Sequence, residues 1–134
     1  MQQNTHLTNL VETIRWMNAK GWSPATSTNY SLRHAENPLL MHISKSGVDK
    51  QFFSESDFML CDFEGLATPE FAAIKPSAET LIHCWLYKKL PETNCILHSH
   101  SVYATVLSRK INSGDLCLNG LEVQKALPGI NSHL

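Results

Sequence analysis

Runs of basic residues are absent from this sequence, and so are long apolar runs. Eleven lysines and arginines stand against twelve aspartates and glutamates, so the formal net charge is −1 and nucleic acid is not an expected partner. The longest apolar stretch, near residues 95–107, is interrupted by His98, Ser99 and His100, so no membrane contact is expected. The first eight residues are polar and lack a signal-peptide core, which predicts a cytoplasmic protein.

Cysteine is scarce too, and its spacing indicates neither a disulfide framework nor a Cys-x-x-Cys metal site. The four cysteines are far apart and have apolar neighbours. A chain of 134 residues can bury a core without covalent cross-links. We therefore expect reduced, mostly buried thiols at Cys61, Cys84, Cys95 and Cys117.

The hydrophobic pattern predicts helices packed against short antiparallel strands. Apolar residues recur at helical spacing from Leu7 to Met17, which predicts one buried stripe. Three short apolar segments separated by turn residues then predict a meander over 30–33, 39–43 and 58–62. A further strand is expected at 94–100, with helices at 101–109 and 122–127. This alternation places the chain in the mixed α/β class.

Between the meander and the last strand, Pro76 and Ser77 are suited to begin a helix. Pro91 would end it. Its buried stripe is predicted to consist of Leu81, Ile82, Trp85 and Leu86.

The sharpest local feature is the pair His98 and His100. Residues two apart on a strand share a face, so both imidazoles would point the same way and could occupy neighbouring positions around one tetrahedral metal ion. Cys95 has the opposite parity and would face into packing. The alternative is a chance His-x-His pair on a solvated sheet face, since two ligands do not make a site.

Three further segments have the composition of anion-binding loops: 27–29, 44–47 and 76–79. Gly47 would let the backbone approach a ligand, and Ser77 would lie at a helix start, where free N–H groups favour a negative group. Ordinary turns and caps have the same composition. Glu79 and Glu122 are similarly ambiguous: each is either a general acid or base or a surface carboxylate favoured by a helix dipole.

Together, the Ser-Thr-Asn-x-Ser loop at 27–31, the Lys-Ser-Gly loop at 45–47, the Ser-Ala-Glu segment at 77–79 and the His-x-His strand resemble the class II aldolase family, from about residue 14 onward. The resemblance implies a three-layer α/β/α domain with a mainly antiparallel sheet, cytosolic and commonly tetrameric. It implies one Zn²⁺ per subunit held by His98 and His100. Glu79 matches the aldolases' acid–base carboxylate, and the phosphate-binding positions match Asn29, Ser46, Gly47 and Ser77.

Segments 43–47, 75–80 and 120–127 are similar to the dehydratase branch of that family, in which Glu122 matches the proton donor and acceptor. The implied reaction is zinc-dependent loss of water from 5-methylthioribulose 1-phosphate in methionine salvage, through an enediolate, to give 2,3-diketo-5-methylthiopentyl 1-phosphate. A sugar-phosphate aldolase or epimerase of the fuculose or ribulose type is the alternative enzyme.

One departure from the family pattern leaves a third interpretation open. The family has a third histidine ligand on a later strand, and His133 is in the wrong context to replace it. Residues 1–134 are therefore expected to be a single, incomplete domain that lacks its last strands and helices. An inactive truncated remnant is the alternative that this departure favours.

Overall fold

The predicted meander is present and is extended by one strand. The computed structural model describes residues 2–111, 120–126 and 128–131. Its sheet has the order β3-β2-β1-β4, and every neighbouring pair is antiparallel. The strands are β1 (Asn29–Arg33), β2 (Leu40–Ser44), β3 (Phe58–Asp62) and β4 (Cys95–His98). In the register between β1 and β4, Asn29 lies opposite His98, which brings two predicted site residues side by side.

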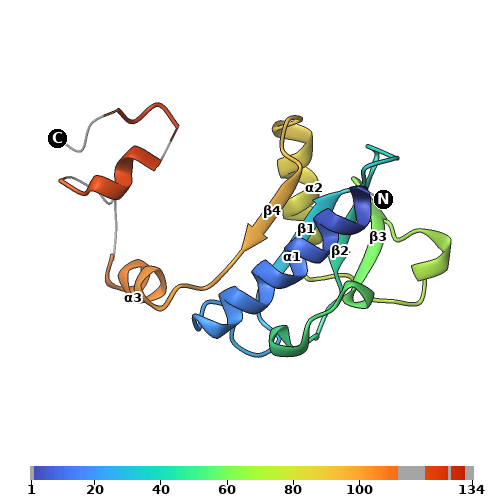
Figure 1. The fold of residues 1–134 in the computed structure, drawn as a ribbon, viewed down its shortest axis with the longest axis horizontal. Coiled ribbons are helices and arrows are strands. Elements are labelled where there is room, and N and C mark those ends of the chain that lie inside the picture. The colour runs from blue at the N-terminus through green and yellow to red at the C-terminus, as the bar shows by residue number, and fades with distance from the viewer. Residues whose placement is uncertain (1, 112–119, 127, 132–134) are drawn as a thin grey trace. The chain divides into compact units, whose positions relative to one another are not determined.

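The helix α1 (Gln2–Ala19) covers one face of the sheet (Figure 1). The predicted stripe is confirmed, because its residues pack with Tyr30 and Phe58 of the sheet in one buried cluster. The fully buried members of α1 are Leu10, Val11, Ile14 and Met17. The helix ends where Gly21 adopts a positive φ of 74° and donates its N–H to the Asn18 carbonyl at 2.8 Å.

The helix α2 (Thr80–Lys89) covers the opposite face, so the three-layer α/β/α arrangement is confirmed (Figure 1). Strand alternation explains the two cores: Phe58 faces α1, whereas its neighbour Met59 packs with Cys84 and Tyr87 of α2. Met41, Ile43 and Cys61 complete this second cluster.

Two predictions about α2 were wrong. The helix begins at Thr80, because Ser77 bonds to the sheet instead of capping the helix. The Ser77 N–H donates to the Ser44 carbonyl at 3.2 Å. Pro76 pairs with Lys45 in an isolated antiparallel β-bridge. The buried face is also different, since Leu81, Ile82 and Trp85 are exposed. The buried residues are Thr80, His83, Cys84 and Tyr87. His83 and Tyr87 can be buried because β1 supplies their hydrogen-bond partner Ser31, and the Thr80 hydroxyl donates to the Ser77 carbonyl at 2.7 Å.

Short 3-10 helices connect these elements: η1 (Lys50–Phe52), η2 (Glu55–Asp57) and η3 (Pro69–Phe71). Residues 103–134 form a separate unit. The helix α3 (Val102–Lys110) leads into it, as predicted, and the short helix expected at 122–127 is the 3-10 helix η4 (Glu122–Ala126). In the ranges described, no helix is both long and apolar enough to cross a membrane.

Two of the predicted thiols are buried and one is not. Cys61 and Cys84 lie in the core, and burial raises the pKa of Cys61 to about 11. Cys95 faces away from the histidine pair, as its parity predicted, but it is exposed and not packed. Cys117 lies outside the described residues.

Acidification is expected to destabilise this fold through His42. Burial, and then the charge of the stacked His34, lower the pKa of His42 from 6.5 to about 4. The unfolded chain therefore takes up this proton first, so the contribution is fully present above pH 6.5 and is lost as the pH falls toward 4. We expect a loss on the order of 2 kcal/mol in the free energy of unfolding.

Urea unfolding at several pH values measures this loss. His42→Asn should flatten the slope between pH 6.5 and 4.5, whereas His6→Asn, at an exposed position, should leave it unchanged. An unaltered slope in His42→Asn would contradict the assignment.

Candidate active site

The two histidines meet at the end of β4. The predicted strand included His100, but β4 ends at His98. The backbone N–H of His100 instead donates to the Trp22 carbonyl at 2.7 Å. The rings nevertheless converge, with their Nε2 atoms 3.0 Å apart. We call these two side chains the histidine pair. Both rings are partly accessible, which suits a site that must admit a substrate.

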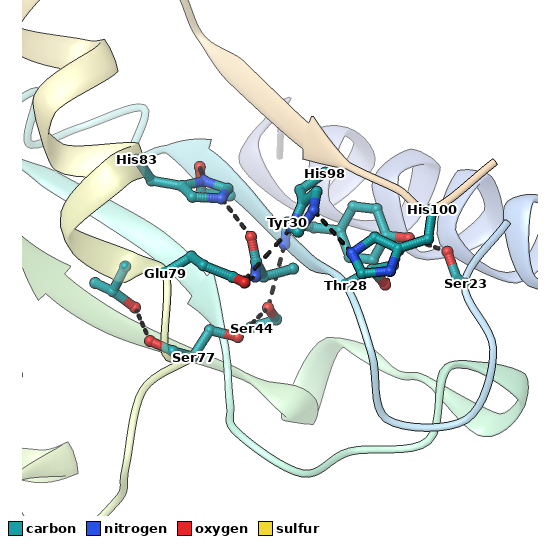
Figure 2. A network of polar contacts seen from close by, with 12 residues as sticks. Ser23, Thr28, Tyr30, Ser44, Ser77, Glu79, His83, His98 and His100 are labelled. Carbon is teal, nitrogen blue, oxygen red and sulfur yellow. Dashed lines mark hydrogen bonds and ion pairs between the residues drawn. The ribbon is translucent and has the colours of Figure 1, made fainter. Parts of the chain in front are cut away.

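Glu79 lies next to the histidine pair. It is the residue just before the first turn of α2, and its Oε2 is 3.5 Å from Nδ1 of His98. Nδ1 is the ring nitrogen that does not face His100. Figure 2 shows Glu79 and His83 projecting from α2 toward the pair. The carboxylate predicted from the Ser-Ala-Glu segment is therefore within reach of a reaction at the pair.

Asn29 links Glu79 to the interior of the domain. Its Nδ2 donates to Glu79 Oε2, and its Oδ1 lies 2.6 Å from Nε2 of His83. His83 is only 2% exposed, and its Nδ1 lies 2.7 Å from the Ser31 hydroxyl. Burial, and then the charge of His98, lower the pKa of His83 to about 4, so its imidazole is neutral at pH 7. His83 was not predicted as a site residue, because a histidine inside a helix carries no signal of its partner.

A cavity of about 220 Å³ brings the three predicted loops together. The contributing residues include His100 of the pair and Thr28 beside Asn29. The lining contains every predicted phosphate-binding residue and the predicted carboxylate: Asn29, Ser46, Gly47, Ser77 and Glu79. A second cavity of about 520 Å³, also lined by Asn29 and Glu79, reaches the apolar side chains Ile82 and Leu86 and includes His98.

The smaller cavity has the donors that an anion needs. In the part of the chain that the structure describes, the backbone N–H groups of Gly47 and Ala78 donate to no protein acceptor. They lie near the start of α2, where the helix dipole favours a negative group. Lys45 does not line this cavity, and its Nζ donates to the Ser56 carbonyl at 2.5 Å. A phosphate here would be met by hydroxyls and backbone N–H groups.

Thr28 lies in a predicted anion-binding loop, but the sequence did not reveal its strained backbone. Its φ is +75°, a conformation that costs a β-branched residue on the order of 1–3 kcal/mol. Its hydroxyl donates to the Tyr30 hydroxyl at 3.1 Å, and Tyr30 is also bonded to Ser23. These buried contacts hold Thr28 in its strained conformation, immediately before Asn29, the first residue of β1.

The histidine pair fits a metal ion in part. Tetrahedral zinc with nitrogen ligands at 2.0–2.1 Å places those nitrogens about 3.3 Å apart. The observed distance of 3.0 Å between the two Nε2 atoms is close to that nitrogen–nitrogen distance. Among the described residues, no three His, Cys, Asp or Glu side chains are arranged to hold an ion together. The pair would therefore supply two ligands, and other groups would complete the set.

Nearly the whole chain matches one family of known proteins. Residues 8–132 match the family described as class II aldolase and adducin N-terminal domain. The chain belongs to this class II aldolase family. The predicted family and fold are therefore confirmed.

Within this family, the chain is similar to curated relatives that share one name. The chain is 43% identical over 134 residues to a methylthioribulose-1-phosphate dehydratase from Enterobacter sp. (strain 638). It is 45% identical over 128 residues to one from Sodalis glossinidius, covering 95% of this chain. It spans 64% and 62% of the lengths of these two relatives, a little less than two thirds.

Solved structures support the same class II aldolase fold. An L-fuculose 1-phosphate aldolase from Glaciozyma antarctica PI12 is 26% identical, with a TM-score of 0.71 over 80% of this chain and 44% of its own. A putative aldolase/epimerase/decarboxylase from Escherichia coli has a TM-score of 0.73 over 90% of this chain and 57% of its own. At 18% identity, this second likeness concerns the fold alone.

Glu122 is not placed relative to the histidine pair. It belongs to the unit of residues 103–134, whereas the pair belongs to Met1–Val102. Only the backbone of η4 is described at Glu122. Its predicted role as a proton donor and acceptor remains a prediction, and His133 lies outside the described residues.

Proposed function

We propose that this domain is part of a methylthioribulose-1-phosphate dehydratase. Such an enzyme removes water from 5-methylthioribulose 1-phosphate to give 2,3-diketo-5-methylthiopentyl 1-phosphate. The identity of 42–45% to relatives of that name, against 24–28% to L-fuculose 1-phosphate aldolases, carries the proposal. The cavity lined by Asn29, Ser46, Gly47 and Ser77 supports a phosphorylated substrate. The adjacent histidine pair supports a metal-assisted reaction.

The chain's own residues divide the work as follows. The hydroxyls and free N–H groups of the smaller cavity bind the phosphate and fix the sugar relative to the pair. His98 and His100 would hold the proposed Zn²⁺, which would stabilise negative charge developing on the substrate. Glu79, beside His98, is positioned to take the proton next to the carbonyl. Glu122 is proposed to protonate the departing hydroxyl.

Two measurements separate this proposal from its alternatives. Assaying the sugar phosphate for loss of water against release of an aldehyde distinguishes the dehydratase from a class II aldolase. Zinc bound per chain distinguishes either enzyme from an inactive remnant. We expect water loss without aldehyde and close to one zinc per chain. Near-zero zinc occupancy with zinc supplied would support the remnant.

Glu122→Gln is expected to lower turnover by about 10²–10⁴-fold, because a positioned acid contributes about that much to proton transfer. Zinc content should stay at the wild-type level. Lys89→Gln, at an exposed position on α2, is the control. Unchanged turnover in Glu122→Gln would remove the proposed role.

A cytoplasmic homo-oligomer is the proposed form of the protein. The large apolar side chains Leu81, Ile82 and Trp85 are exposed along α2, which supports an assembly that covers them. Light scattering after size-exclusion chromatography measures the mass. A monomer at micromolar concentration would contradict the assembly.

A further inference from the structure

A continuous chain of hydrogen bonds runs from the buried side of α2 to Glu79. It connects Tyr87, Ser31, His83, Asn29 and Glu79 in that order. The Tyr87 and Ser31 hydroxyls are 2.9 Å apart, and the Ser31 hydroxyl is 2.7 Å from His83 Nδ1. His83 Nε2 is 2.6 Å from Asn29 Oδ1, and Asn29 Nδ2 contacts Glu79 Oε2. None of these groups except Glu79 was predicted as part of the reaction's proton chemistry.

With the His83 ring neutral, the carboxylate fixes the direction of the bonds from Glu79 to Ser31. A carboxylate can only accept, so Asn29 must present its amide nitrogen to Glu79 and its oxygen to His83. The oxygen can only accept as well, so His83 must carry its proton on Nε2. Nδ1 is then an acceptor, and the Ser31 hydroxyl donates a hydrogen bond to it. Ser31 is then left to accept from the Tyr87 hydroxyl, whose other acceptor, the Asn94 carbonyl, is farther away at 3.4 Å.

We propose that His83 is a positioning residue: as the neutral imidazole protonated on Nε2, it fixes the Asn29 amide so that Asn29 holds the Glu79 carboxylate beside the histidine pair. The claim that this affects turnover rests on the proposed function, but the bonding itself does not. His83 and Asn29 are both 2% exposed, so water does not compete for their bonds. Packing between β1 and α2 therefore sets where Glu79 points.

The arrangement also explains why a polar face of α2 is buried. His83 and Tyr87 are one turn apart and both bond to Ser31, the central residue of β1. The buried stripe that the sequence predicted would have packed apolar groups there and left the Asn29 oxygen without a donor. Glu79 would then keep one bond to an amide that is free to rotate.

The bonding is tested on the wild-type chain by ¹⁵N NMR of labelled histidine. We expect His83 to show a neutral ring with its proton on Nε2 near pH 7, with and without zinc. In Asn29→Ala the ring should lose that single fixed tautomer, because the remaining partner, the Ser31 hydroxyl, can either donate or accept. A proton on Nδ1 of the wild-type ring, or a charged ring, would overturn the proposal whether or not the chain has activity.

The effect on turnover is tested by combining His83→Phe with Glu79→Gln. His83→Phe should lower kcat by about 10–100-fold through misplacement of Glu79. KM should change less than kcat, because Ser46, Gly47 and Ser77 keep their phosphate contacts and only the Asn29 contact is disturbed. In the Glu79→Gln background the same change should have no further effect, and zinc affinity should stay the same.

His83→Gln offers one donor and one acceptor and should recover kcat to within about threefold of wild type. His6→Phe, on the exposed side of α1, is the matched control. Equal losses from His83→Phe in both backgrounds would show that His83 does not act through Glu79 and would overturn the proposed effect on turnover. If the wild-type chain turns over no substrate, the proposed function fails, and the NMR result still decides the role of His83 in the bonding.

Discussion

Replacement of His98 by alanine is expected to weaken zinc binding by more than about 100-fold and to abolish turnover with it. Loss of a group that merely supports a zinc ligand commonly costs 10–100-fold in metal affinity, so loss of a ligand should cost more. The effect should be specific to the metal, because the ring lies at the accessible end of β4 and makes no contact in either buried cluster. Zinc affinity is measured by competition with a chromophoric chelator, and turnover by water loss.

His100→Ala should behave in the same way, since its Nε2 faces the Nε2 of His98 at 3.0 Å. The control is His6→Ala, which removes an exposed imidazole from another element. Thermal unfolding of the zinc-free variants should match that of the zinc-free wild type. Wild-type zinc affinity in either pair variant would rule out the histidine pair as the metal site.

The strands could be predicted because their signals are local. A short apolar segment followed by turn residues specified β3 at 58–62 with correct bounds, and the apolar stripe of α1 was also correct because its spacing is local. The anion-binding loops were found because small hydroxyl residues and Gly47 occur together in each segment. That these loops line one cavity depends on the sheet register, which the sequence shows only through its resemblance to a family.

The orientation of α2 could not be predicted because it depends on partners about fifty residues away. Its sequence has two possible inward faces, one with Leu81 and Trp85 and one with His83 and Tyr87. The first is favoured by hydrophobicity alone, and the second wins because Ser31 and Asn29 of β1 satisfy its polar groups. Ser77 was misread for a related reason, since its backbone bonds to Ser44 of β2.

These long-range contacts also determine how the site works. Asn29 was predicted only as a phosphate-binding residue, yet its amide is already bonded to Glu79 and His83. One N–H of that amide remains for a phosphate in the adjoining cavity. A single side chain would then set the distance between the phosphate and the carboxylate, so substrate binding and proton transfer would depend on the same bond network.

Glu79→Gln is expected to lower kcat by about 10²–10⁴-fold, the usual contribution of a positioned general base. Two roles are open to this carboxylate, and the geometry favours one of them. Its Oε2 is 3.5 Å from Nδ1 of His98, which is longer than an N–H···O hydrogen bond of 2.7–3.2 Å. Support of the His98 ring is therefore weak, and zinc affinity should fall by less than about tenfold.

Glutamine keeps the size and one oxygen of Glu79, so the bond from Asn29 can be retained while the basic group is lost. Glu64→Gln is the matched control, because that carboxylate is exposed and pairs with Lys88 away from the cavity. Parallel measurements of kcat and zinc affinity separate the roles. A large loss of zinc affinity with kcat preserved at saturating zinc would mean that Glu79 holds the metal site in place and takes no proton.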